Sequence, residues 1–287
     1  MAVIGNVNIA EEYSRVVEPN LYPDSTLVPG VTFNPHTLEG AGGRYIPQVV
    51  KGGVIDPTLP GQDYNFSNAS DKLIQIVANN SITPSKRIRN AQVASVQYPV
   101  VEENIATLVS GSVKPSFNAQ GIACLVNEGT VLEDTTAITK DNIKSYLIKL
   151  RKTLRDKGAN GNVLIVNTEV YSCILEAAGA DFDNEVKNMI NMEGGVGKWL
   201  GWVIIESNVL SLVTQGKYFN YSGALQTVDL SKVEVIAYDW QKFYVDTLIE
   251  MLKVQDATTF NGVEIVSEFI NGYRVSDSSC VLVKKTA

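Results

Sequence analysis

Two neighbouring stretches decide the fold of this chain: NVLIVNTEVYSCILEA (residues 162–177) and GGVGKWLGWVIIESNVLS (residues 194–211). NVLIVN is a continuous apolar run, which predicts a strand buried on both faces of a sheet. The pattern that follows predicts a helix that opens at Thr168 and extends through Ala178. In the second stretch, GWVIIESN predicts another strand. The middle of the chain is therefore expected to be an α/β unit.

The segment TKDNIKSYLIKLRKTLRDKG (residues 139–158) predicts an amphipathic helix in the same unit. We expect Thr139 to cap its start and Gly158 to end it. The apolar positions of one helix face are Ile143, Leu147, Leu150 and Leu154. Arg155 and Lys157 are basic residues that suit the negative, C-terminal end of the helix dipole. KVEVIAYD (residues 232–239) predicts a further strand, so residues 130–245 are expected to form a sheet with helices on it.

The segments before this unit have a different pattern. Residues 1–39 are rich in proline and polar residues, which predicts an extended arm that is ordered only by lying on something else, such as another copy. Two β-rich runs, Arg44–Val50 and Lys72–Ile82, predict a long hairpin with a loose tip near Gly52–Ala69. Helical spacing then predicts one long helix over about residues 90–128, bent at Gly111 to Pro115.

The last segment contains β-rich runs that are separated by FNG (260–262) and ING (270–272). Asn-Gly pairs readily adopt positive φ, so both sites are predicted to be hairpin turns.

GGVGK (residues 194–198) invites comparison with a phosphate-binding loop. Such a loop needs a glycine five residues before the Gly-Lys pair and a Ser or Thr after it, following a buried strand. The chain has Met192 and Trp199 at these two positions, and the preceding FDNEVKNMINM is polar. The glycines are better interpreted as a turn leading into WVIIES, where Trp199 and Trp202 pack. Lys198 is then either a surface charge or part of an interface.

Composition excludes several other classes of function. A formal net charge of −7 argues against a surface that neutralises nucleic acid over its whole area, although it allows one local basic face. The chain has a single histidine, His36, which excludes a multi-histidine metal site. His36 itself is interpreted as a loop residue. The three cysteines, Cys124, Cys173 and Cys280, lie far apart in sequence and indicate incidental thiols. The N-terminus has no signal-peptide pattern, and no apolar run is long enough to span a bilayer.

The order of arm, hairpin, long helix, α/β unit and terminal β region resembles the tailed-bacteriophage major capsid proteins of the Hong Kong 97 phage fold. The resemblance covers essentially the whole chain, and GGRYIP opens the hairpin as in that family. The family pattern G-x-v-G-x-i-x-G-x-x-V-x-x-S-n-x-L is similar to the positions Gly195, Gly197, Gly201, Val203, Ser207, Asn208 and Leu210.

The resemblance implies an α+β fold with named parts. These are an N-terminal arm (1–39), an E-loop hairpin (40–75), a peripheral domain with a spine helix (76–129 and 246–287) and an axial domain (130–245). Some family members form an isopeptide bond from an E-loop lysine. Lys51 is the only lysine between residues 40 and 71, and no crosslink is predicted.

The resemblance also implies partners. The chain is expected to self-assemble as pentamers and hexamers into an icosahedral shell that encloses double-stranded DNA. Its contact with that DNA is expected to be weak and non-specific. Further partners are a separate scaffolding protein, a portal and decoration proteins. The location is the virion, after assembly in the host bacterial cytoplasm. No catalytic residue, cofactor, metal or membrane is implied.

Two alternatives stay open. An encapsulin-type bacterial compartment shares the fold but encloses cargo enzymes, and a small-molecule- or nucleotide-binding α/β enzyme built on residues 130–245 is less favoured. A small basic cluster of Lys86, Arg87 and Arg89 either faces DNA or meets solvent or an acidic neighbour, and the second interpretation is favoured.

Overall fold

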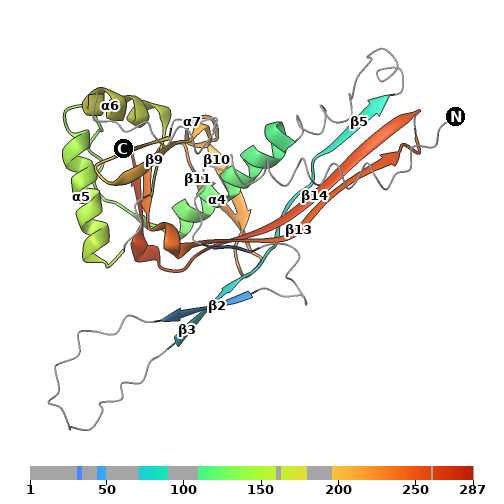
Figure 1. Cartoon of the computed structure of the whole chain (residues 1–287), viewed down its shortest axis with the longest axis horizontal. Helices are drawn as coiled ribbons and strands as arrows, with labels where there is room; N and C mark the ends of the chain where they lie inside the picture. The colour runs from blue at the N-terminus through green and yellow to red at the C-terminus, as the bar shows by residue number, and fades with distance from the viewer. Residues whose placement is uncertain are drawn as a thin grey trace, which may run out of the picture.

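The computed structural model describes residues 31–33, 44–49, 71–89, 109–159, 163–179, 196–259 and 261–286. In these residues an α/β body lies at one end, and a long β ribbon projects from it (Figure 1). The arm before residue 31, His36, Lys51, the hairpin tip at 52–69 and the first part of the expected long helix lie outside the described residues.

A six-stranded sheet forms the centre of the α/β body. In spatial order its strands are β6 (Thr130–Val131), β15 (Val281–Lys285), β12 (Val233–Tyr238), β7 (Val163–Val166), β9 (Trp202–Glu206) and β8 (Val196–Trp199). β7 and β9 are parallel, whereas β12 is antiparallel to both of its neighbours. All four residues of β7 are buried, as the apolar run predicts.

Two cores cover the two faces of this sheet, because side chains alternate along each strand. Val163 and Ile165 enter one core, and Leu164 and Val166 enter the other. The second core is covered by α5 (Ile143–Asp156) and α6 (Thr168–Ala178). The first is covered by α4 (Lys114–Glu128), α7 (Asn208–Leu212) and the hairpin of β10 (Gln215–Phe219) with β11 (Leu225–Asp229).

The predicted helices of the body are confirmed, with one correction. α6 has the expected bounds, and α5 buries the four expected apolar residues. Thr139 does not cap α5. Asn142 precedes the helix, and its side-chain oxygen accepts from the Thr139 backbone N–H at 2.8 Å, so the cap interaction runs in the opposite direction. Gly158 ends the helix with φ of 74°.

The projecting ribbon belongs to a five-stranded sheet. Its long strands β13 (Phe243–Asp256) and β14 (Gly262–Val275) pair with each other. β1 (Val31–Phe33) is parallel to β13, whereas β4 (Asn80–Ile82) and β5 (Ser85–Arg89) are antiparallel to β14. α4 lies beside this ribbon (Figure 1). A π-helical turn, η2 (Val109–Val113), precedes α4, at the point where a bend was predicted.

The hairpin before these strands is confirmed for its two paired runs. β2 (Arg44–Val49) is antiparallel to β3 (Asp71–Ile76). The run Lys72–Ile82 is not one strand, however. It breaks at residues 77–79, and β4 then joins the five-stranded sheet because Ile82 is buried there.

One expectation for the last segment is wrong. Asn271 and Gly272 of ING lie inside β14 and are no turn, whereas β13 ends at Asp256 and β14 begins at Gly262, so the chain reverses near FNG as predicted. β15, the last strand of residues 246–287, pairs with β12 in the six-stranded sheet and not with β13 or β14. Two 3-10 turns flank the ribbon, η5 (Trp240–Lys242) and η6 (Ser278–Cys280), and η6 leads the chain back.

Candidate functional site

The glycine-rich stretch forms part of a hairpin and not a phosphate cradle. Gly197 and Lys198 lie in β8, opposite Ile204 and Val203 of β9. Their backbone groups therefore belong to a strand ladder and do not converge on a ligand. The turn itself is formed by Leu200 and Gly201, with φ of 51° and 76°, as two-residue hairpin turns require. The interpretation of Gly197 as part of the turn is therefore wrong, while Gly194 and Gly195 lie outside the described residues.

α5 holds this turn in place. Arg151 donates from Nη1 to the Leu200 carbonyl oxygen at 2.7 Å, and Trp202 donates from Nε1 to the Leu147 carbonyl oxygen at 3.3 Å. Trp199 and Trp202 are both buried, as predicted, whereas Lys198 is exposed. The stretch therefore fixes the edge of the sheet against α5.

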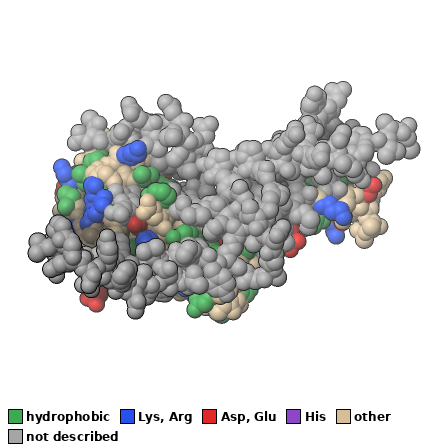
Figure 2. All heavy atoms as spheres, turned by 60° about the horizontal axis from the view of Figure 1, so that its bottom comes forward, with side chains coloured by type: hydrophobic (Ala, Val, Ile, Leu, Met, Phe, Trp, Pro, Cys, Tyr) green, Lys and Arg blue, Asp and Glu red, His purple; other side chains and the backbone are tan. Residues whose placement is uncertain are grey.

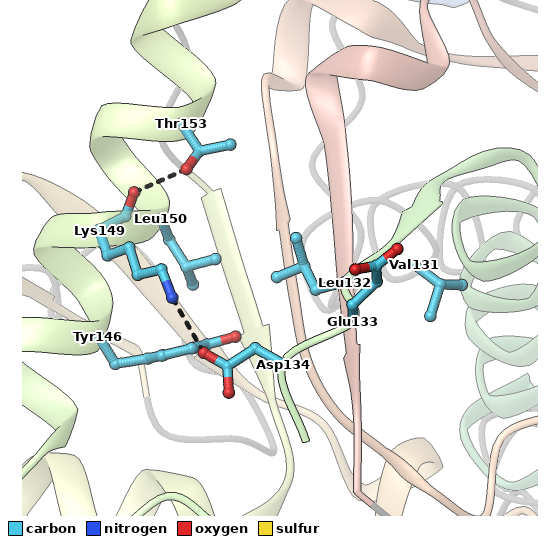
Figure 3. Close-up of a pocket in the computed structure, with 8 residues that line it drawn as sticks. All are labelled: Val131, Leu132, Glu133, Asp134, Tyr146, Lys149, Leu150 and Thr153. Carbon is cyan, nitrogen blue, oxygen red and sulfur yellow. Dashed lines mark hydrogen bonds and ion pairs between the residues drawn. The ribbon is translucent and has the colours of Figure 1, made fainter. Parts of the chain in front are cut away.

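A cavity of about 410 Å³ lies between α5 and the segment that follows β6. Figure 3 shows Tyr146, Lys149 and Leu150 of α5 on one side, and Asp134 of the other segment turned toward them. Lys149 Nζ donates to Asp134 Oδ2 at 3.1 Å. The cavity is also lined by Val131, Leu132, Glu133 and Thr153.

The charged groups around this cavity hold chain segments together. Lys284 of β15 is buried, and its Nζ donates to the backbone oxygens of Asp134 at 3.0 Å and Thr136 at 2.7 Å. Hydrogen bonds from Thr136, then from Lys149, lower the pKa of Asp134. Burial raises the pKa of Tyr146. A nucleophile with a neighbouring base is not among these groups, so the cavity lacks the arrangement of a hydrolytic site.

A second polar junction joins α4 to β14. Glu128 accepts from Arg274 Nη1 at 3.0 Å and from the Val275 backbone N–H at 2.9 Å. The Arg274 guanidinium lies 4.1 Å from the ring centroid of Tyr221, in the turn between β10 and β11. Burial raises the pKa of Glu128, against the opposing effects of Val275 and Arg274. This junction joins the end of α4, which covers the six-stranded sheet, to β14 of the five-stranded sheet.

A third junction ties the β10–β11 hairpin to the strand β4. The Asn80 side chain donates to the Phe219 carbonyl oxygen at 3.0 Å and accepts from the Phe219 N–H at 2.6 Å. Asn79 donates to the Asn220 carbonyl oxygen at 2.6 Å. These contacts add polar specificity to the packing of α4 against the same hairpin.

Of the three cysteines, Cys124 lies close to other ionisable groups, namely Glu128, Arg274 and Tyr218, but its environment does not favour the thiolate. Cys124 and Cys280 are buried and Cys173 is half-buried, and all three are free thiols. Burial raises the pKa of the Cys124 thiol, which suppresses the thiolate form. Among the described residues, no group of three His, Cys, Asp or Glu side chains could hold a metal ion. No described helix has the length and apolarity needed to cross a membrane.

Comparison with solved structures shows that this architecture is similar to that of phage capsid proteins. The chain superimposes on the capsid structure of the cyanophage P-SCSP1u with a TM-score of 0.65 at 13% identity, covering 92% of this chain and 87% of that one. For the mature capsid of bacteriophage PhiM1 the TM-score is 0.58 at 11% identity, covering 93% and 86%. The fold is the Hong Kong 97-type capsid fold.

A third neighbour is the virus-like particle from Pyrococcus furiosus. It matches with a TM-score of 0.55 at 12% identity, covering 99% of this chain and 100% of that chain. Comparison of the sequence with protein-family models and with curated proteins finds no significant match.

In the described part of the chain, the ribbon of β13 and β14 projects from the α/β body (Figure 1). The described residues do not form a metal site or a hydrolytic site. We therefore take their outer surface as the candidate functional site.

Lys86 and Arg87 of the basic cluster lie on β5, where it pairs with the beginning of β14 near the end of the ribbon. Arg87 of β5 is exposed and forms an ion pair with Glu264 of β14, with Nε to Oε1 at 3.0 Å. Figure 2 shows basic side chains at this end of the molecule and also at the end formed by α5 and α6. Sequence reasoning missed the second group. Its signal was the density of basic residues in IKLRKTLRDK (148–157).

Proposed function

We propose that this chain is the major capsid protein of a tailed bacteriophage. Its role is to self-assemble as pentamers and hexamers into an icosahedral shell that encloses double-stranded DNA. The function is structural, so no residue has a catalytic role and no cofactor is used.

One observation carries this proposal. The chain is similar over about nine tenths of its length to phage capsid structures. The projecting ribbon of β13 and β14 supports it, since a subunit that buries the ribbon against neighbours gains hydrophobic free energy that a monomer lacks. The antiparallel pair of β2 and β3 also supports the proposal, because an isolated two-stranded hairpin is marginal in water and gains stability by packing on a neighbour.

The parts of the fold take roles within this proposal. Residues 1–39 act as the N-terminal arm and 40–75 as the E-loop. The peripheral domain comprises 76–129, with α4 as part of the spine helix, and the ribbon of β13 and β14. The axial domain is the six-stranded sheet with α5 and α6. It therefore includes β15, which its pairing with β12 supports.

The direct test is electron microscopy of the expressed protein, alone and with a candidate scaffolding protein. We expect rings or closed shells. A protein that stays monomeric under all assembly conditions, while it remains folded by circular dichroism, would contradict the proposal.

The second candidate is the shell of an encapsulin-type compartment. The particle from Pyrococcus furiosus matches both chains over essentially their whole length, which favours this reading specifically. The contents of shells from the natural host distinguish the two. Packaged double-stranded DNA, with terminase and portal genes nearby, supports the phage role. Packaged enzyme, with a cargo gene nearby, supports the compartment.

Further partners follow from the phage role. We propose a separate scaffolding protein, a portal, decoration proteins and weak non-specific contact with DNA, with assembly in the host bacterial cytoplasm and location in the virion. The net charge of −7 supports the weak contact, because an acidic container does not trap its DNA during packaging.

A further inference from the structure

The helix α5 carries an unusual concentration of positive charge. Residues 140–157 contain seven basic side chains and two acidic ones, a net charge of +5 in a chain of net charge −7. Lys144 and Lys152 are exposed, and among the described residues neither forms an ion pair. Between them lies Ile148, with 53% of its surface exposed. We call Lys144, Ile148 and Lys152 the basic face.

The neighbouring helix α6 has the opposite charge. It contains two glutamates and no basic residue, and Glu169 and Glu176 are both exposed. Leu175, beside Glu176, has 42% of its surface exposed. We call Glu169, Leu175 and Glu176 the acidic face.

The two faces match in spacing and composition. Lys144 and Lys152 are separated by about 12 Å along α5, and Glu169 and Glu176 by about 10 Å along α6. Each pair accompanies one exposed aliphatic side chain. Ile148 lies between its two lysines on the same side of α5, whereas Leu175 lies about 100° around α6 from Glu176, beside the acidic pair. Exposed apolar side chains next to charged ones are a composition found at protein interfaces.

The arrangement of the helices suits contact between copies. α5 and α6 are neighbours over one face of the six-stranded sheet and run along adjoining edges of the α/β body in Figure 1. Complementary faces at two different positions on one subunit produce a head-to-tail contact, and repetition of such a contact closes a ring when the rotation fits.

We propose that the basic face of α5 docks on the acidic face of α6 of the next copy around a ring. The inference rests on the proposed function, since it names the surfaces through which subunits of one pentamer or hexamer meet. DNA is the less favoured occupant of the basic face, because phosphate contact gives no role to exposed Ile148 or to the acidic face.

Two charge-reversed variants test this pairing. The first is Lys144→Glu with Lys152→Glu, and the second is Glu169→Lys with Glu176→Lys. Each variant alone sets like charges against each other, so we expect the population of rings to fall at least about tenfold, measured by native mass spectrometry and electron microscopy.

Mixing the two variants in equal amounts gives the sharper result. Each face of one variant then complements a face of the other, so rings reappear with the two variants alternating. Alternation closes only with an even number of subunits, so hexamers return and pentamers do not. A chain that carries all four substitutions restores both kinds of ring.

The control is Lys217→Glu with Lys232→Glu, which makes the same change of charge at exposed positions on and beside the β10–β11 hairpin. It should assemble like the wild type. Circular dichroism melting of every variant checks that the fold is kept.

Several results would overturn the inference while the proposed function stands. These are normal assembly of both reversed variants, loss of assembly that mixing fails to restore, or normal shells of the first variant with less bound DNA. Failure of the wild type itself to assemble would instead contradict the proposed function, and the inference with it.

Discussion

The side chain of Asn80 pairs with a neighbouring strand much as a backbone amide group would. Its side-chain amide bonds both the N–H and the carbonyl oxygen of Phe219, as a paired backbone would. Asn80 is 1% exposed, so an unsatisfied polar group left at this site would lack water. A single side chain thereby holds the β10–β11 hairpin to the long sheet.

Replacing Asn80 with Ala should therefore be costly. It leaves two backbone groups of Phe219 without this partner, and we expect a loss of about 3 kcal/mol in the free energy of unfolding. Urea titration of the unassembled subunit measures it. Asn79→Ala is the comparison, with an expected loss of about 1 kcal/mol. It removes the bond to Asn220 and the bond that Asn79 accepts from Asn80, but it leaves both bonds between Asn80 and Phe219. Equal effects of the two variants would contradict this account.

Glu128 gives the subunit a particular dependence on pH. Burial raises its pKa above the ordinary 4.5, although Val275 and Arg274 act in the opposite direction. The folded state therefore binds this proton more tightly than the unfolded state does. The contribution is fully present below pH 4.5 and is lost as the pH rises through the raised pKa.

Substitution of Glu128 by Gln isolates this contribution. We expect the stability of the wild type relative to the variant to decrease as the pH rises from about 4.5, because only the wild type releases the proton. Cys124 and Tyr218, whose pKa values burial also raises, stay neutral over that range. Urea titrations of both proteins at several pH values provide the comparison. A relative stability that increases with pH would mean that Arg274 dominates instead.

Among the elements, those with a strong local pattern were predictable from sequence. The alternation of β7 between two cores and the 3.6-residue spacing of α5 are visible in the residues themselves. The β10–β11 hairpin was missed, because its outward face is mixed and its turn, YSG, is not one of the strong hairpin signals. At the candidate site, sequence established that GGVGK is no phosphate loop, but not that Lys198 lies in a strand.

The partner of a strand is set by the whole chain and not by its own residues. VLVKK (281–285) reads as a strand, but nothing local distinguishes pairing with β12 from pairing with β14. ING failed for a related reason. Gly272 in β14 serves close approach of another chain segment, since a Cβ there would lie 2.7 Å from the carbonyl carbon of Val77.

Gly272→Ala should consequently disturb the crossing of residues 77–79 over β14. The added methyl group meets backbone, which cannot swing aside as a flexible side chain can, so we expect a loss of about 2 kcal/mol. Gly111→Ala is the control, because a Cβ there meets nothing within 4 Å. Thermal melting of both variants distinguishes them, and an unchanged melting temperature for Gly272→Ala would show that the segment shifts freely.

At the scale of the whole molecule, the projecting ribbon distinguishes this chain from a compact enzyme. Its strands β13 and β14 have 14 residues each and extend from the α/β body (Figure 1). A neighbouring copy that covers the ribbon binds the folded subunit and therefore also stabilises it, so stability and assembly are linked.

The unassembled subunit should be measurably extended. A compact chain of 287 residues has a radius of gyration of about 19 Å, and we expect a clearly larger value by small-angle X-ray scattering at concentrations below assembly. A value near that of the compact chain would contradict the projecting ribbon.

The position of β15 has a consequence for synthesis. This strand lies between β6 and β12, yet its residues come after all the other strands of the sheet in chain order. Until the ribosome has made residues 281–285, β12 lacks a neighbour on one side and β6 has no partner in the sheet. A nascent chain therefore cannot complete its α/β body early, and neighbouring polysome-bound copies cannot associate through that body before translation has passed this strand.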